Sequence, residues 1–408
     1  MVVIATLASA VASAPGAEAP LSDRIEVLEK EIADLKQAAD GDKADKKSLW
    51  SSLDVQFYGY IKADAAHDSS RTTTGNYVLY VDSEATRNND REFNLTAGET
   101  RLGFNFTGPG SETMKTTGKV EFDFFGNLAA ENKAKIQMRH AYMNLEWPGA
   151  QFSLLAGQTW DVISPLNPST LNYPVLWEAG NIGYRRPQIR LTKGVDLTDE
   201  VSLKFQGAMV RTIGRTDPTN SETGEDAGIP TLQGRVGVTF HGFGPKPTTV
   251  GLSGHVGKEE YDIDATGRNL DFDSESINLD VTQPVCSWMT LKAELFSGNN
   301  LSAYLGGIGQ GVNTTSLNEI SSQGGWIAAS LGPWSKWSFN VGAGVDNVDR
   351  DDVEVGGRTR NSCVFGNVRY AVNSHAQVGL ELSQWDTSYK GVGDADNTRL
   401  QASFIYKF

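Results

Sequence analysis

The first candidate for chemistry is a group of charged side chains at the two ends of residues 159–184. They are Asp161, Glu178, Arg185, Arg186 and Arg190. A guanidinium group offers a planar fork of N–H donors that grips a carboxylate or phosphate through two parallel hydrogen bonds. Facing carboxylates would add a transverse field, as charged rings do in selective pores. The group predicts a site that guides small anions, with the alternative that Arg185 and Arg186 only tie down the loop.

Residues 159–184 are too apolar for a loop that moves freely in water. They carry three prolines and the apolar side chains Val162, Ile163, Leu166, Leu171, Val175, Leu176 and Trp177. We expect this segment to fold inward against a surrounding wall and to narrow a pore.

The elements that must position this site are amphipathic strands. Leu102, Phe104 and Phe106 alternate with polar residues or glycine, and the same period of two recurs from Leu53 to the end of the sequence. Such alternation is typical of strands with one apolar face.

The connections between these strands alternate in length. Short ones such as 148–150 and 241–246 separate long ones such as 66–97, 259–273 and 387–396. Short turns at one rim and long loops at the other are the pattern of outer-membrane barrels. The sequence therefore predicts an all-β fold, a transmembrane antiparallel β-barrel of about 16 strands over residues 53–408.

Charged residues in the strands should face the lumen, because Arg or Lys facing mid-bilayer lipid costs about 2–4 kcal/mol. The basic residues placed there are Lys62, Arg101, Lys119, Arg190, Lys204, Arg235, Lys292 and Arg369, and the acids are Asp54, Glu121, Asp123, Glu294 and Glu381. Arg101, Lys204 and Arg235 join the anion-guiding candidates, although paired wall charges are an equal alternative for any one residue. An interior of this width is expected to hold water.

The first 52 residues divide into three expected segments. Residues 1–19 are signal-peptide-like, being apolar and small, and residues 40–52 are a polar linker. Between them, residues 20–39 carry a heptad seam of apolar residues at Leu21, Ile25, Leu28, Ile32 and Leu35. Two heptads are too short to be stable alone, so this periplasmic coiled-coil helix would be held by a dimer or trimer formed elsewhere, or would lie as an amphipathic helix on its own chain.

Aromatic residues mark the expected membrane boundaries. The last strand ends in Phe404, Tyr406 and Phe408, which resembles the signal that the barrel-assembly machinery reads for insertion. An aromatic girdle at the rims is predicted for Tyr58, Trp147, Trp160, Trp288, Trp326, Trp334 and Trp337.

Composition excludes several other classes of function. The formal charge of −14 opposes a nucleic-acid partner, since phosphate binding needs a basic field. Five histidines lie outside any GxSxG or HExxH pattern, so we expect no enzyme, metal or cofactor. Cys286 and Cys363 should sit unbonded at opposite rims. A structural or adhesin-type barrel without an open pore is the main alternative, and a soluble lectin-like repeat protein is a weaker one.

Three motifs also resemble a known family. The segment Gly157-Gln158-Thr159-Trp160, the stretch from Pro168 to Leu171, and Arg185-Arg186-Pro187-Gln188-Ile189-Arg190, together with the heptad segment, resemble the DcaP-like trimeric porins of Gram-negative outer membranes. The resemblance implies a homotrimeric 16-stranded barrel in outer-membrane lipid with a periplasmic coiled coil. It also implies passive uptake of small anions such as dicarboxylates, with Arg185, Arg186 and Arg190 matching the family's arginine-rich strand.

Overall fold

The computed structural model describes Lys30, Ala33 and residues 53–85, 90–126, 134–214, 224–262 and 269–408. Lys30 and Ala33 are helical. The predicted heptad residues Leu21, Ile25, Leu28, Ile32 and Leu35, the signal-like segment 1–19 and residues 40–52 lie outside the described residues. No helix in the described part of the chain is long and apolar enough to cross a membrane.

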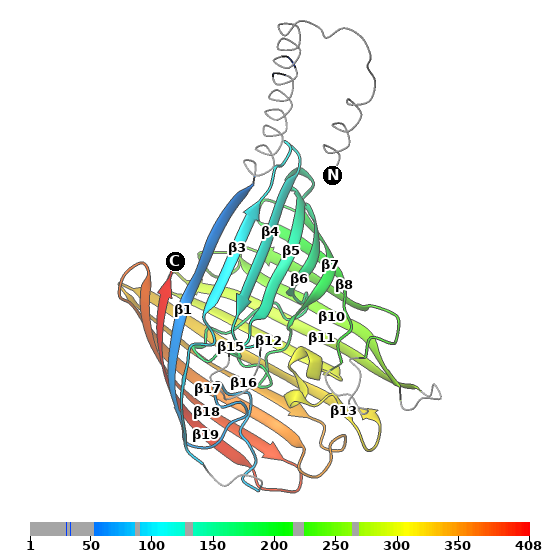
Figure 1. Cartoon of the computed structure of the whole chain (residues 1–408), viewed down its shortest axis with the longest axis vertical. Helices are drawn as coiled ribbons and strands as arrows, with labels where there is room; N and C mark the ends of the chain where they lie inside the picture. Colours follow the sequence, from blue (N-terminus) through cyan, green and yellow to red (C-terminus); the bar gives the residue numbers. More distant parts are fainter. Residues whose placement is uncertain are drawn as a thin grey trace, which may run out of the picture. The chain divides into compact units, whose positions relative to one another are not determined.

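Residues from Val55 onward form a closed antiparallel barrel of 16 strands, as the alternation predicts (Figure 1). The wall consists of β1 (Asp54–Asp68), β2 (Glu92–Thr96), β3 (Arg101–Thr107), β4 (Lys115–Asp123), β5 (Gln137–Trp147), β6 (Phe152–Trp160), β7 (Arg185–Asp196), β8 (Val201–Val210), β9 (Thr231–Phe240), β10 (Thr248–Asp262), β11 (Asn269–Cys286), β12 (Met289–Asn299), β15 (Ser321–Trp334), β16 (Trp337–Val348), β17 (Arg358–Ala371), β18 (Ala376–Tyr389) and β19 (Ala395–Lys407). Both β2 and β3 pair with β1, so together they make one interrupted strand. The ring closes between β1 and β19, where Tyr60 lies opposite Lys407.

Short elements lie in the connections. They are the 3-10 helices η1 (Pro148–Ala150), η2 (Ser302–Tyr304) and η3 (Gly307–Gly309), and the two-residue strands β13 (Val312–Asn313) and β14 (Asn318–Glu319).

Short and long connections alternate around the barrel, as predicted, but two of the expected long loops are partly strand. β10 runs to Asp262 and β11 begins at Asn269, and only residues 390–394 separate β18 from β19. The prediction was wrong there because outward Asp271 and Asp273 read as loop residues. Ladder hydrogen bonds continue through them in register with Lys258 and Glu260.

Lipid-facing and lumen-facing side chains alternate along the strands. Ile277, Leu295 and Ile327 point outward and are 60%, 58% and 54% exposed. Of the predicted aromatic girdle, Trp288, Trp334 and Trp337 lie exposed near the short turns. The girdle prediction was wrong for the inward residues: Trp326 is buried, Trp160 lines an internal cavity, and Tyr58 donates a hydrogen bond to Glu121.

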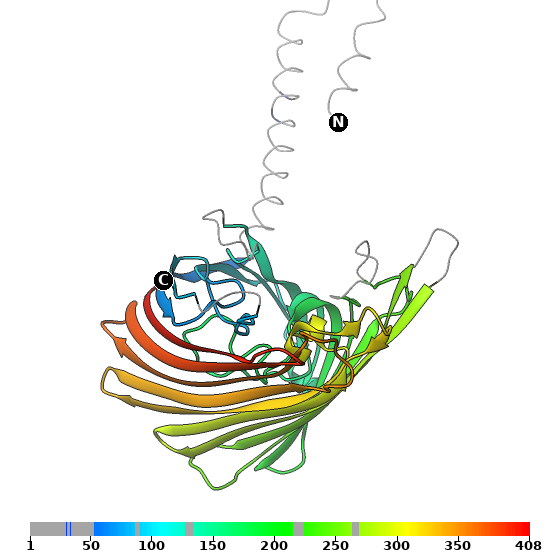
Figure 2. The same ribbon diagram turned by 90° about the horizontal axis from the view of Figure 1, so that it is seen from below.

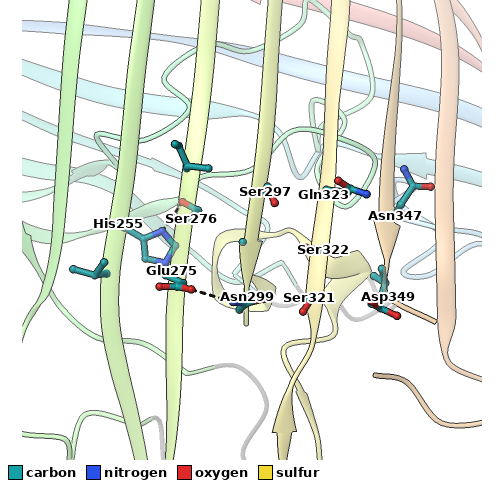
Figure 3. A pocket seen from close by; sticks show the side chains of 14 residues that line it. His255, Glu275, Ser276, Ser297, Asn299, Ser321, Ser322, Gln323, Asn347 and Asp349 are labelled. Carbon is teal, nitrogen blue, oxygen red and sulfur yellow. Dashed lines mark hydrogen bonds between the residues drawn. The ribbon is translucent and has the colours of Figure 1, made fainter. Parts of the chain in front are cut away.

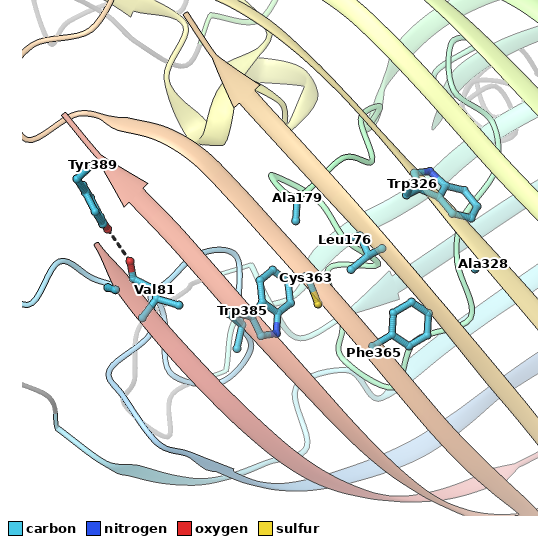
Figure 4. Packing of buried hydrophobic residues seen from close by; sticks show 11 residues of the cluster. Val81, Leu176, Ala179, Trp326, Ala328, Cys363, Phe365, Trp385 and Tyr389 are labelled. Carbon is cyan, nitrogen blue, oxygen red and sulfur yellow. Dashed lines mark hydrogen bonds between the residues drawn. The ribbon is translucent and has the colours of Figure 1, made fainter. Parts of the chain in front are cut away.

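Three long connections fold into the barrel and line it from within (Figure 2). They are residues 69–85 of the first connection, residues 161–184, called here the inward loop, and residues 300–320. Leu176 and Ala179 of the inward loop and Val81 of the first connection pack on buried Trp326, Cys363, Phe365 and Trp385 of the wall (Figure 4). This side of the interior is therefore an apolar core rather than open water.

The inward loop lies so close to the wall that one residue must lack a side chain. Gly180 has φ +109°, and a Cβ there would lie 2.2 Å from the carbonyl oxygen of Gly325. Only glycine tolerates this backbone conformation and this approach together.

Buried wall carboxylates hold the inward loop through its backbone. Glu381 accepts hydrogen bonds from the N–H groups of Leu171 (2.5 Å) and Asn172 (3.1 Å). Glu294 accepts one from Leu166 N–H at 2.8 Å. A buried N–H group without a partner is costly, so these acids fix the position of the loop.

Candidate functional site

An internal cavity of about 410 Å³ lies between the inward loop and strands β1, β3, β4, β5 and β6. Its lining residues are Tyr60, Glu99, Arg101, Lys119, Glu121, Arg139, His140, Trp160, Asn167, Thr170, Asn172, Tyr173, Val175 and Trp177. The wall contributes most of the charged groups, and the inward loop contributes amides and aromatic rings. We call this space the lumen cavity.

Glu121 on β4 is the centre of the charged side of the lumen cavity. Its carboxylate lies 2.8 Å from Arg139 Nε, 3.5 Å from Lys119 Nζ and 3.7 Å from Arg101 Nε. Tyr58 Oη donates to it at 2.7 Å. Arg139 also reaches Asp123 at 2.8 Å. Two acids thus face three cations, which leaves one positive charge in excess.

The cations and acids of this group differ in their access to water. The side chains of Arg101 and Lys119 are 23% and 26% exposed, whereas those of Glu121 and Asp123 are 5% and 0% exposed. A solute entering the lumen cavity therefore meets positive groups first. The acids lie behind them and hold them in place.

A second ion-pair group lies beside the first, on β1. Lys62 pairs with Glu99 and lies 3.4 Å from Asp64, and its Nζ also donates to the carbonyl oxygen of Leu171 at 2.8 Å. Lys62 is 3% exposed. It ties the inward loop to the wall and presents little charge to the lumen.

Tyr173 of the inward loop joins the aromatic side of the cavity to the charged side. Burial raises the pKa of Tyr173 to about 12, so the phenol keeps its proton and donates to Asp123 Oδ2 at 3.0 Å. Its ring packs against Phe125 and Trp177, with centroids 4.6 Å and 5.8 Å apart.

The predicted pair Arg186 and Asp161 meets, but inside the protein. Arg186 Nε lies 2.9 Å from Asp161 Oδ1, and both side chains are at most 2% exposed. Arg186 also donates to Ala303 O at 3.1 Å and lies 3.9 Å from the ring centroid of Tyr304. This contact joins the inward loop to the 300–320 connection.

Arg185 and Arg190 lie at the edge of the same junction. Arg185 is 3% exposed, and its guanidinium lies 4.6 Å and 4.8 Å from the rings of Tyr184 and Trp160. Arg190 donates to Gln188 Oε1 at 2.9 Å and to the carbonyl oxygen of Trp160. Neither residue lines the lumen cavity.

The remaining predicted site residues are dispersed. Arg235 makes a bidentate pair with Asp280 at 2.9 and 2.6 Å, Glu178 is fully buried, and Lys204 is exposed on the lumen face of β8. Of the predicted anion-guiding residues, Arg101 lines the lumen cavity.

Simple alternation missed Arg139. The register between β4 and β5 shifts between Glu121 and Phe122, and this bulge turns both Arg139 and His140 inward. An unbroken alternation would aim Arg139 at lipid, at a cost of about 2–4 kcal/mol. That cost was the signal that could have revealed the bulge.

Comparison with known proteins bears on the motifs around this site. The family model described as DcaP outer membrane protein matches residues 26–224, which include the inward loop, the arginine-rich strand and all the residues that line the lumen cavity. The resemblance to the DcaP family is confirmed. No curated protein sequence matches the chain significantly.

Solved structures agree on the fold. The DcaP outer membrane channel of Acinetobacter baumannii is similar with a TM-score of 0.70 and 18% identity, over 88% of this chain and 98% of that chain. The anion-selective porin of Comamonas acidovorans gives 0.55 and 12%, over 87% and 100%. The trimer form of Vibrio cholerae OmpT gives 0.53 and 11%, over 88% and 100%. The chain thus has the closed β-barrel fold of these outer-membrane porins.

Proposed function

We propose that this barrel is a passive channel for small hydrophilic solutes and that it prefers anions, dicarboxylates included. Transport through it would follow the solute gradient.

One observation carries the preference for anions. Arg101 and Lys119 face the lumen cavity while their paired acids lie behind them. In a confined space with protein walls, two cationic heads lower the energy of an entering carboxylate and raise that of a cation. Two cations at neighbouring positions also suit a solute with two carboxylates.

The inward loop gives this channel its narrow section. Its backbone is held at Leu166, Leu171 and Asn172 by wall carboxylates, and its side chains close one side of the lumen cavity. The loop would act as a fixed constriction rather than a moving gate.

The assembly proposed for the channel is a homotrimer in outer-membrane lipid, and its N-terminal heptad segment would form a coiled coil on the periplasmic side. The trimer form of a structurally similar barrel supports this. The terminal Phe404, Tyr406 and Phe408 would be read by the barrel-assembly machinery during insertion.

The test is conductance of the purified full chain in a planar bilayer under a KCl gradient, repeated with a dicarboxylate salt. We expect each insertion to show three conductance steps, one for each channel of a trimer. The reversal potential should lie toward the equilibrium potential of the anion. Stable insertion without conductance would overturn the channel and favour the structural or adhesin-type barrel. Cation selectivity would keep the channel and refute the role given to Arg101 and Lys119.

A further inference from the structure

A second cavity, of about 540 Å³, opens on the outer face of the barrel across β10, β11, β12, β15 and β16 (Figure 3). Its outward side chains form a polar belt, defined here as Glu275, Ser297, Asn299, Ser321, Gln323, Asn347 and Asp349. Strand pairing brings these residues side by side: Glu275 lies opposite Asn299, and Gln323 lies opposite both Ser297 and Asn347.

The polar belt begins where the apolar outer band ends. On the same strands, the outward positions nearer the short turns are Ile277, Leu295, Ile327 and Val345. The belt lies at the other ends of these strands, toward the long loops, which face the cell exterior in outer-membrane barrels. It therefore lies at the depth of the lipid headgroups of the outer leaflet.

The inner side of this wall is already covered. His255, which lies behind the belt, is 2% exposed, and its ring packs on Tyr304 of the 300–320 connection with centroids 4.1 Å apart. The belt residues point the opposite way, so partners other than the belt residues themselves must come from outside the barrel.

The chemistry of the polar belt suits hydroxyl groups better than phosphates. Its side chains are hydroxyls, amides and two carboxylates, and none of the described residues that line this cavity is Lys or Arg. Headgroup phosphates are normally bound by such basic residues. Among the described residues, the side chains of Ser297, Gln323 and Asn347 form no hydrogen bond with protein, while Asn299 donates to Glu275 at 3.1 Å.

We propose that the polar belt binds the saccharide headgroup of an outer-leaflet glycolipid, whose acyl chains lie on the apolar band beside it. Amides can both donate to and accept from sugar hydroxyls, and carboxylates can accept from them. The recess would exclude part of the surrounding water from these hydrogen bonds. This inference rests on the outer-membrane location and does not depend on conduction.

The experiment is native mass spectrometry of the full chain in detergent, titrated with a phosphate-free glycosyl diacylglycerol or with phosphatidylglycerol. We expect the glycosyl diacylglycerol to bind at least tenfold more tightly than phosphatidylglycerol. The double variant Gln323→Ala/Asn347→Ala should lose at least tenfold in affinity for the glycosyl diacylglycerol. Ser297→Trp, which fills the cavity and keeps the other groups, should lose as much.

The matched control is Gln384→Ala/Thr398→Ala. These residues are also an outward cross-strand pair near the long loops, on β18 and β19, and lie outside the cavity. Only variants that keep the electrophoretic mobility of the folded barrel in unheated sodium dodecyl sulfate are compared. Unchanged binding in the belt variants, an equal loss in the control, or equal affinity for the two lipids would overturn the proposal.

Discussion

Neutralising the two water-facing cations of the lumen cavity should weaken its preference for anions. The variant is Arg101→Gln/Lys119→Gln, which keeps side chains of similar length and removes two charges. In an aqueous pore, the interaction energy between a unit charge and an ion about 7 Å away is about 0.6 kcal/mol. This energy has opposite signs for anions and cations, so each removed charge changes the energy difference between them by about 1.2 kcal/mol. The anion-to-cation permeability ratio should therefore fall roughly eightfold for each charge.

The variant Glu121→Gln should shift the permeability ratio in the opposite direction. This change removes the acid shared by Arg101, Lys119 and Arg139 and leaves an amide that still accepts from Tyr58. The permeability ratio should rise by a similar factor of roughly eight. Opposite shifts from neighbouring residues would separate a charge effect from a general disturbance of the pore.

The assay is the reversal potential in planar bilayers under a KCl gradient, kept below about 0.1 M because the Debye length falls to roughly 3 Å at 1 M salt. Lys193→Gln is the control. Lys193 is an exposed lysine on β7 whose Nζ donates to Ala150 O beside a short turn. The reasoning is refuted if the double variant keeps the wild-type reversal potential or if Lys193→Gln shifts it equally.

Three further predictions concern stability and the interior. Arg139→Leu leaves two buried carboxylates without their closest cation, so the free energy of unfolding should fall by about 3–5 kcal/mol in urea titration; an unchanged midpoint would contradict this. Glu381→Ala frees two N–H groups of the inward loop, each worth about 1–3 kcal/mol, and should make single-channel current noisier, whereas steady current would show that other contacts suffice. Cys286 is half-buried and Cys363 is buried, both as free thiols, so maleimide should label Cys363 only after unfolding, and equal labelling in the folded protein would disprove its burial.

Much of the wall was predictable because the sequence of each strand alone indicates which of its faces is apolar. The alternation of Leu102, Phe104 and Phe106 with polar residues assigns a lipid face and a lumen face without reference to any other strand. The alternation of short and long connections supplied the antiparallel order. Strand ends were less predictable, since the polar outward residues of β10 and β11 look like loop residues when the neighbouring strand is unknown.

The arrangement of the site needed the tertiary structure. The bulge that turns Arg139 inward is a register relation between β4 and β5, and neither strand shows it alone. Trp160 and Trp326 could belong to a rim or to an interior, and only the folded loops beside them decide which.

The sequence by itself determined that this chain is a barrel with a charged interior and an apolar inward loop, because period, loop length and the cost of a charge in lipid are local properties. Only the tertiary structure decided which charges meet water. Arg186 is buried against Asp161, Arg235 is held by Asp280, and Arg101 is left facing the lumen. The pairing of a cation depends on which distant strand or loop reaches it, and the closure of the barrel and the docking of its loops fix that choice.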